Sequence, residues 1–429
     1  MRIGFVSHTD PGHMNPMSTL ARRVKSRGHD VFFITTPDGA PHAAAAGLTH
    51  VPFGERSFPL GSVRERHTIQ SRLQGIEATT FAVEKLGEVC RALYEDLPGL
   101  LPRLALDSVV MDPIHIGTGV IPASLGLPYV HAHCALHFDL SGRTPLFIYD
   151  WPHGTTEQDL ARNRAGVAAV MNLLEPFFTN ARQYAEGHGL TIDFADPFAT
   201  LSPLAILTQI PRQLDFPGVC WPQQFHYAGP FSDGAGRIAT TFPWEKLTGR
   251  PILYASMGTL QNGLSHIFET IGRVACQFPN YQLVVSLGEV LSSESIRTFP
   301  MDAIVLPSVP QVEVLKRAAL CITHAGLNTT LEALAQGVPL VAIPITNDQP
   351  GVAARIVQTG VGEVVPLQEL TDATLEKAMS KLLSNTSYTK AAHEMRTAIQ
   401  DTDGLNAAAE RIETVFRETS FERLGGQSG

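Results

Sequence analysis

Cysteine is scarce in this chain of 429 residues, and the five cysteines lie far apart: Cys90, Cys134, Cys220, Cys276 and Cys321. No two of them form a Cys-x-x-Cys pair, which disfavours a disulfide framework and a zinc site and fits a reducing compartment. The sequence also lacks the roughly 20 consecutive apolar residues of a membrane-spanning helix, and its first apolar run is too short for a signal peptide. We therefore expect a cytoplasmic protein, and contact with a membrane surface stays open.

Positive charge is also in short supply. The chain has 32 lysines and arginines against 41 acidic residues, which gives a formal net charge of -9. This balance argues against nucleic acid as a partner, because phosphate backbones need clustered cations. An anionic ligand must instead be held by local positive potential, such as that of helix N-termini. No Gly-x-Gly-x-x-Gly motif follows the first apolar run, which disfavours an enzyme that transfers hydride on a dinucleotide fold.

Apolar residues are plentiful, at 44% of the sequence, and the length suits two domains of roughly 200 residues each. Short apolar runs alternate with helical patterns in two series, one that begins at residue 3 and one that begins at residue 251. Such alternation predicts two doubly wound α/β domains with parallel sheets. Ligands of such sheets lie at the carboxyl ends of the strands, so we expect a cleft between the domains.

The expected domain boundaries follow from the same patterns. Residues 1–215 form the N-terminal domain, and residues 216–250 are rich in proline and glycine and are predicted as the linker. Residues 251–404 form the C-terminal domain, and a helix over residues 405–421 is expected to pack back on the N-terminal domain. Residues 422–429 are predicted to be a frayed, flexible tail. Residues 145–198 have a helical pattern with several aromatic side chains, which suits a cover over the cleft.

The most informative segment begins at His324, directly after an apolar run, and leads through Gly326 into a helical pattern that ends at Gly337. A strand, a loop and a helix in this order direct free N–H groups and the positive end of the helix dipole at the loop, as in a phosphate site. Gly326 lets a ligand approach the backbone. Asn328 and Thr329 offer hydrogen bonds, and one of them is expected to cap the helix; helix capping alone is the competing explanation of these residues.

Two acidic positions complete this segment. Glu332 lies one turn inside the helix, where it suits ribose hydroxyls as acidic residues do in dinucleotide folds. Asp348 and Gln349 follow the next apolar run, and a carboxylate and an amide can each bind two neighbouring sugar hydroxyls. An ordinary turn is the alternative for this pair.

The residues from Pro310-Gln311 through His324, Glu332 and Gly337 to Asp348-Gln349 resemble the donor-binding signature of the UDP-glycosyltransferase family (GT1), whose fold is the two-domain GT-B fold. Residues 256–261 and 348–357 resemble the zeaxanthin and carotenoid glucosyltransferase branch. The likeness is densest in the C-terminal half. It implies a transferase that takes a UDP-sugar as co-substrate, with glucose favoured as the sugar, and with no metal and no further cofactor.

The resemblance also implies roles for single residues. His324, Gly326, Asn328 and Thr329 would hold the diphosphate, with Glu332 on the ribose and Asp348 and Gln349 on the hexose. The nucleobase would lie against Val309 and Gln311, and further phosphate contacts would come from Ser256 and Thr259. Plant members stack uracil on a tryptophan at the position of Ser308, so the stacking partner of the base is not evident in this chain.

A sugar transfer needs a base for the acceptor hydroxyl, and a histidine suits this task. His13 stands in a Gly-His-x-x-Pro setting after the first apolar run and matches the base of the family. Its place at a helix N-terminus is expected to keep it neutral. Asp112, at the end of another apolar run, matches the orienting carboxylate of the family and would fix the tautomer of His13. Structural roles for both are the alternative, and His8 competes as the base.

Three further histidines, His131, His133 and His137, lie close together in the sequence. Two of them share one face of a predicted strand, and no helical His-x-x-x-His pair accompanies them, so we favour core or acceptor-pocket histidines over metal ligands.

The sequence thus predicts an inverting transferase that acts on a hydrophobic, hydroxylated small molecule, such as a carotenoid, a phenol or flavonoid, or a macrolide. A sugar-nucleotide epimerase on the same fold and a non-catalytic nucleotide-sugar-binding protein are the alternatives. The acceptor itself stays undetermined, because the loops that form acceptor pockets vary freely on one scaffold.

Overall fold

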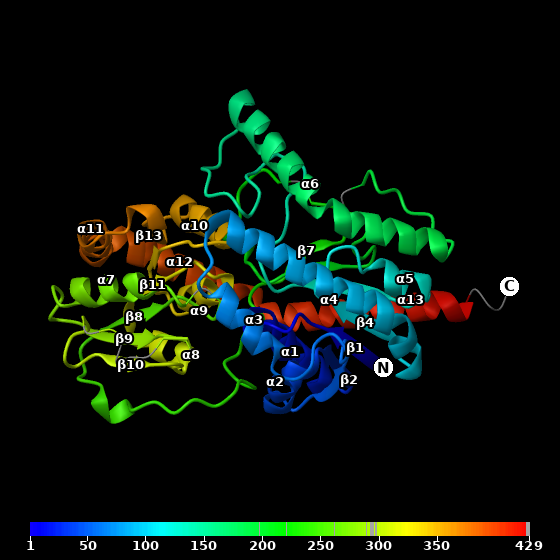
Figure 1. The fold of residues 1–429 in the computed structure, drawn as a ribbon, viewed down its shortest axis with the longest axis horizontal. Helices are drawn as coiled ribbons and strands as arrows, with labels where there is room; N and C mark the ends of the chain where they lie inside the picture. Colours follow the sequence, from blue (N-terminus) through cyan, green and yellow to red (C-terminus); the bar gives the residue numbers. More distant parts are fainter. Residues whose placement is uncertain are drawn as a thin grey trace.

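The computed structural model describes residues 1–429 except 197, 220, 261, 289, 292–295, 297 and 426–429; the side chains of residues 76 and 420–425 are also left out. Two parallel sheets organise the chain, and helices cover them (Figure 1). No helix in the described part of the chain is long and apolar enough to cross a membrane.

The first sheet has seven parallel strands in the order β3-β2-β1-β4-β5-β6-β7. Its central strands are buried along almost their whole length, which explains why they are continuous apolar runs in the sequence. The strands are β1 (Arg2–Val6), β2 (Asp30–Thr35), β3 (Thr49–Pro52), β4 (Ser108–Met111), β5 (Tyr129–His133), β6 (Ile206–Thr208) and β7 (Phe225–Tyr227).

The helices of this half connect its strands and build one wall of the cleft. The two longest, α4 and α6, contain prolines inside them, and α6 projects from the top of the molecule in Figure 1. The helices are α1 (Pro11–Ser26), α2 (Ala40–Ala45), α3 (Ser62–Gln70), α4 (Gly75–Arg103), α5 (Val120–Ser124) and α6 (Glu157–Gly187), with the short 3-10 helices η1 (Pro37–Gly39) and η2 (Arg212–Leu214).

The second sheet has six parallel strands in the order β10-β9-β8-β11-β12-β13. They are β8 (Ile252–Ser256), β9 (Gln282–Ser286), β10 (Ile304–Leu306), β11 (Ala318–Thr323), β12 (Leu340–Ala342) and β13 (Gly362–Val364). The helices are α7 (Ser265–Ala275), α8 (Gln311–Leu315), α9 (Leu327–Ala335), α10 (Gln349–Gln358), α11 (Asp372–Ser384) and α12 (Thr386–Thr402), with η3 (Trp244–Lys246) and η5 (Leu367–Glu369).

The last helix, α13 (Gly404–Gly425), returns to the first half of the molecule (Figure 1). It packs against α1, and its apolar side chains share a core with the first sheet: Leu405, Ala408, Ala409, Ile412, Val415 and Phe416. Glu413 on the same helix accepts hydrogen bonds from Arg27 and His29 at 2.9 Å. The C-terminal helix therefore ties the end of the chain to the N-terminal sheet.

Two details differ from the sequence prediction. Strand β7 lies inside residues 216–250, which were predicted as linker; it pairs with β6 although it is only three residues long and is flanked by prolines and glycines. Helix α13 runs to Gly425, so residues 422–425 are helical and not a frayed end. Residues 426–429 of the predicted tail lie outside the described part of the chain.

Candidate active site

A large cleft of about 1180 Å³ lies where the carboxyl ends of the two sheets face each other. The loops that follow β1, β5, β8, β11 and β12 all contribute to it, and so do helices α3 and α6 and residues 230–232 and 237 of the linker. Each sequence-predicted site residue except the buried Asp112 lines this cleft. The position agrees with the rule that ligands of doubly wound sheets bind at the carboxyl ends of the strands.

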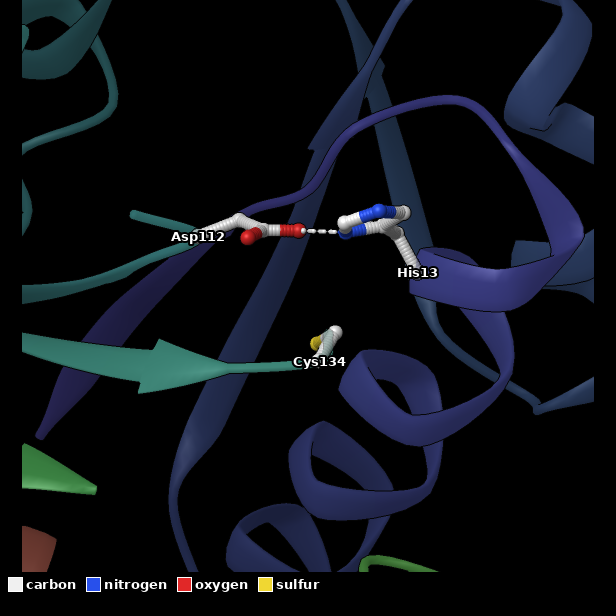
Figure 2. Close-up of side chains that lie close together, drawn as sticks. All are labelled: His13, Asp112 and Cys134. Atoms are coloured by element: carbon white, nitrogen blue, oxygen red, sulfur yellow. Dashed lines mark hydrogen bonds and ion pairs between the residues drawn. The ribbon is translucent and has the colours of Figure 1, made fainter. Parts of the chain in front are cut away.

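His13 and Asp112 meet beyond the carboxyl ends of two central strands of the first sheet (Figure 2). His13 is the third residue of α1, after β1, and Asp112 directly follows β4; the two strands are neighbours in the sheet. Nδ1 of His13 donates to Oδ2 of Asp112 at 2.7 Å, and Oδ1 of Asp112 accepts from the N–H of Ile114 at 3.2 Å. This pairing leaves Nε2 of His13 free of its proton, which is the tautomer that a general base needs.

The charges around His13 act against the predicted effect of the helix N-terminus. Burial lowers the pKa of His13, but Asp112 and, more weakly, Asp10 and Asp348 raise it, and the net shift is upward. The helix N-terminus was expected to favour neutral His13, but the three carboxylates favour its protonated form, and their effect exceeds that of burial. For Asp112, burial opposes the charged form, yet His13 lowers its pKa to about 2, so it stays ionised.

Beside this pair lies a buried polar cluster that the sequence reasoning missed. Asp10, the residue before α1, accepts a hydrogen bond from Arg66 and lies 2.7 Å from Nε2 of His67 and 3.2 Å from Nε2 of His8. Burial lowers the pKa of His8, and the ring of His8 contacts that of His13 edge to face at 5.4 Å between centroids. His8, the competing base, is thus paired with Asp10, whereas Asp112 is paired with His13. No spacing in the sequence pointed to Arg66 or His67, which α3 supplies.

The donor loop after β11 has the predicted strand, loop and helix. A Cβ atom at Gly326, or at Gly258 of the opposite loop, would clash with the imidazole of His324, so both positions require glycine. Burial lowers the pKa of His324 to about 4, which makes it a neutral hydrogen-bonding group at neutral pH. Gly326, not Asn328 or Thr329, is the N-cap of α9, and no described side chain caps the helix. Its first N–H groups are therefore available to a ligand.

Asn328 makes a different contact from the one predicted. Its Nδ2 donates to the carbonyl of Gly12 at 2.6 Å, and its Oδ1 accepts from Nε2 of Gln209 at 2.9 Å. Gly12 is the residue before His13, so the side chain joins the donor helix α9 to the helix that carries the candidate base. Its neighbour Thr329 is buried, and its hydroxyl accepts from Nε2 of Gln311 at 3.3 Å.

Glu332 is buried at the floor of the same half of the cleft, with 5% of its side chain exposed. Oε2 accepts from Nε2 of Gln311 at 2.7 Å, and Oε1 accepts from Arg237 of the linker. The sequence reasoning missed Arg237, because nothing in the spacing of the linker pairs it with a helix residue 95 positions away. The hydroxyl of Tyr254 donates to Oε1 of Gln311 at 2.8 Å and holds that amide in place.

The remaining predicted donor residues lie around this group. Val309 is buried next to the exposed Ser308, while Ser256 ends β8 and Thr259 lies in the loop that follows it. Asp348 was predicted at the end of a strand, but it lies directly before α10. Its Oδ2 accepts a hydrogen bond from the N–H of Leu136 across the cleft at 3.0 Å. Burial raises the pKa of Asp348.

Gln349 is oriented differently from the prediction. It is 3% exposed, and its Oε1 accepts from the N–H groups of Ile345 and Thr346 at 2.8 and 3.0 Å. The amide oxygen thus shapes the loop rather than projecting into the cleft.

The three clustered histidines are buried in the first half of the molecule. His131 accepts from the N–H of Ser202 at 2.9 Å, and His137 contacts Thr208 and Asp215 at 3.1 Å, as expected for core histidines. His131 and His133 also line a small apolar cavity behind the cleft.

One group in the described residues has the composition of a metal site, and it coincides with the candidate base: His13, Asp112 and Cys134 (Figure 2). Burial, and to a smaller extent Asp112, raise the pKa of Cys134 well above its usual range. The carboxylate of Asp112 already accepts a hydrogen bond from Nδ1 of His13 at 2.7 Å, so two of the three groups are paired with each other. The chemistry of the donor set favours an acid–base pair at this point.

Comparison with known proteins agrees with this geometry. A family model described as UDP-glucoronosyl and UDP-glucosyl transferase matches residues 290–422. An NDP-glycosyltransferase of Bacillus licheniformis is 30% identical over 412 residues, which cover 94% of both chains. The zeaxanthin glucosyltransferase of Pantoea ananas is 28% identical over 408 residues, 94% of this chain and 93% of the relative.

Solved structures confirm the GT-B fold that the resemblance implied. The glycotransferase of kitacinnamycin superposes with a TM-score of 0.70 at 23% identity, over 96% of this chain and 98% of that one. Glycosyltransferase VinC, solved with dTDP, superposes with a TM-score of 0.68 at 17% identity, over 97% and 100%. The chain belongs to the UDP-glucuronosyl and UDP-glucosyl transferase family, and it is a glycosyltransferase that takes a nucleotide-sugar donor and a small-molecule acceptor.

Proposed function

We propose that this glycosyltransferase moves a hexose, glucose in the first instance, from a UDP-sugar to a hydroxyl of a hydrophobic small molecule, with inversion at the anomeric carbon. His13 is the general base, and Asp112 orients it. The observation that carries the proposal is the 2.7 Å hydrogen bond between these two side chains, in a cleft whose opposite wall is the N-terminus of α9. The contact of Asn328 with Gly12 puts that helix end beside the candidate base.

The proposed reaction is a single displacement. The acceptor oxygen forms a bond to the anomeric carbon while the bond between that carbon and the β-phosphate oxygen breaks. The hydroxyl proton passes to Nε2 of His13, and the nearby Asp112 carboxylate stabilises the imidazolium that forms. The products are the glycoside and UDP, which takes the electron pair of the broken bond. Attack from the face opposite the leaving group inverts the configuration.

The proposed donor site lies in the second half of the molecule. The uncapped N–H groups at the start of α9 and the neutral imidazole of His324 suit the diphosphate, and Glu332 suits the ribose hydroxyls. Asp348 lines the cleft, and its carboxyl suits the hexose hydroxyls. The donor is proposed as UDP-glucose because of the family description and the first two glucosyltransferase relatives.

The proposed acceptor site lies in the first half. Its wall is largely apolar and comes from α4, α6 and the loops after β4 and β5, with Leu86, Ile116, Phe138, Phe147, Val170 and Leu174 among its residues. Such a wall favours hydrophobic acceptors. The names of two relatives agree with such acceptors: a zeaxanthin glucosyltransferase and, at 26% identity, the demethyllactenocin mycarosyltransferase of Streptomyces fradiae. We therefore propose carotenoids, phenols or flavonoids, and macrolides as the classes to test.

The test is a panel of these acceptors with UDP-glucose, in which mass spectrometry detects the product and UDP release is followed in parallel. His13→Ala is expected to lower kcat by about 10²–10⁴-fold, the usual contribution of a general base. The matched control is His266→Ala, which removes an exposed histidine of α7 outside the cleft and is expected to retain wild-type turnover. Turnover that survives His13→Ala would contradict the proposed base, and no product with any sugar nucleotide would contradict the proposed reaction.

A further inference from the structure

The linker supplies part of the wall of the cleft through Pro230, Phe231, Ser232 and Arg237. Asp233 anchors this segment to α1, because both of its carboxylate oxygens lie 2.5 Å from the guanidinium of Arg22. On the other side, Arg237 of the segment donates to Glu332 of α9. The segment therefore contacts helices of both halves of the molecule. The ion pair of Asp233 with Arg22 fixes the backbone four residues before Arg237.

Arg237 contacts the carboxylate that was predicted to bind ribose. Its guanidinium donates to Oε1 of Glu332, and a second contact joins it to Oγ of Ser232 at 3.3 Å. Oε2 of Glu332 accepts a hydrogen bond from Gln311, so both oxygens of the carboxylate are hydrogen-bonded. Each carboxylate oxygen has two acceptor positions, so Glu332 can still accept from two ligand hydroxyls. Burial lowers the pKa of Arg237, but Glu332 raises it by more, so the guanidinium stays charged.

The charge of Arg237 is unusual for its surroundings. Among the described residues of the second half that line the cleft, from Tyr254 to Pro350, there is no lysine or arginine. His324 is neutral there, while Glu332 carries a negative charge close to the proposed diphosphate site. Without a cation beside it, this carboxylate would repel the donor phosphates. The Nε of Arg237 is buried without a hydrogen-bond partner among the described residues, so a ligand oxygen at this point would be favourable.

We propose that Arg237 is a positioning residue for the donor: it fixes the carboxylate of Glu332 toward the ribose 2′- and 3′-hydroxyls and compensates its charge. The inference rests on the proposed function and deepens it. It states that the contact of the linker residue Arg237 with Glu332 lets the enzyme distinguish a ribonucleotide from a 2′-deoxyribonucleotide. Discrimination of this kind arises when a buried polar group loses its ligand partner. The segment anchored by Arg22 and Asp233 thus connects the N-terminal half to ribose recognition.

The test is calorimetric titration of the whole protein with UDP and with 2′-deoxy-UDP, which needs no turnover. The wild type is expected to bind UDP roughly tenfold or more tightly than 2′-deoxy-UDP, since a hydrogen bond to a charged group is lost. Arg237→Met is expected to weaken UDP binding by a similar factor and to remove most of that preference. Arg237→Lys, which keeps the charge, is expected to restore part of both.

A double-mutant cycle separates positioning from direct phosphate binding. If Arg237 acts through Glu332, Arg237→Met in a Glu332→Gln background causes no further loss of UDP affinity. Arg273→Ala is the matched control, because Arg273 pairs with Asp372 far outside the cleft. Thermal unfolding of each variant excludes a loss of folding as the cause.

Two results would overturn the inference while the proposed function stands: wild-type affinity in Arg237→Met, or an equal loss for UDP and 2′-deoxy-UDP with additive effects in the cycle. A wild-type protein that binds neither nucleotide would instead contradict the proposed donor, and the inference with it. The wild-type titration thus tests the proposed function, and the comparison of variants tests the role of Arg237.

Discussion

Replacing Asp112 by asparagine preserves the shape of the side chain and removes its charge, so it tests the candidate pair with little change in packing. Oδ2 of Asp112 is 2.7 Å from Nδ1 of His13, and Asp112 is 1% exposed. An asparagine can turn its NH₂ group toward Nδ1, which would then act as the acceptor. The proton of the imidazole would move to Nε2, where the acceptor hydroxyl must bind, and the ring could no longer serve as a base.

The expected magnitude follows from what is lost. General-base catalysis contributes about 10²–10⁴-fold, and the wrong tautomer removes most of it, so kcat of Asp112→Asn is expected to fall by about 10²–10³-fold. The Km for the donor is expected to stay within about threefold, because Asp112 does not line the cleft.

The pH dependence supplies an independent readout. The base must be neutral, so kcat/Km of the wild type is expected to rise with pH through the raised pKa of His13. Asp112 is the largest cause that raises this pKa, so the rising limb is expected to move to lower pH in Asp112→Asn while the plateau falls. The assay is kcat/Km for the best acceptor between about pH 5 and 9, the range in which histidine titrates. Wild-type kcat, or a limb that stays in place, would refute the assignment of the pair.

Three further predictions concern other parts of the structure. Gly326→Ala puts a Cβ against the imidazole of His324, so the donor Km is expected to rise about tenfold or more; an unchanged Km would mean that the loop adapts freely. Asn328→Ala breaks the link to Gly12, so kcat is expected to fall more than UDP affinity, and the reverse order would indicate that Asn328 binds the diphosphate. Arg27 and, to a smaller extent, His29 lower the pKa of Glu413 to about 2, although burial opposes this shift. The stability that this carboxylate contributes is therefore present above its unfolded-state pKa and is lost as the pH falls toward 2. Glu413→Gln is accordingly expected to lower Tm by a few degrees at pH 7 and less at pH 3, and equal changes at both pH values would contradict the pairing.

Much of the fold could be predicted from the sequence because it depends on local patterns. Buried parallel strands need continuous apolar runs, and the runs at β1, β4, β8 and β11 were evident without any structure. The same locality made Gly326 recognisable as a point of close approach. Local patterns were misleading where a competing contact exists. Asn328 has the chemistry of a cap, but its side chain binds Gly12 and Gln209 instead.

Only the tertiary structure decided which distant groups act together. His13 and Asp112 lie 99 positions apart and meet because β1 and β4 are adjacent, an order that no local pattern specifies. The upward pKa shift of His13 depends on three carboxylates from different loops, and so it could not be derived from a helix N-terminus alone. Arg237 reaches Glu332 only because the linker crosses the cleft. The sequence alone determined the two α/β halves and the chemical groups at their strand ends, since these depend on short-range backbone geometry. The partner of each group was decided by strand order and by the docking of the two halves, since these depend on the summed packing of the whole chain.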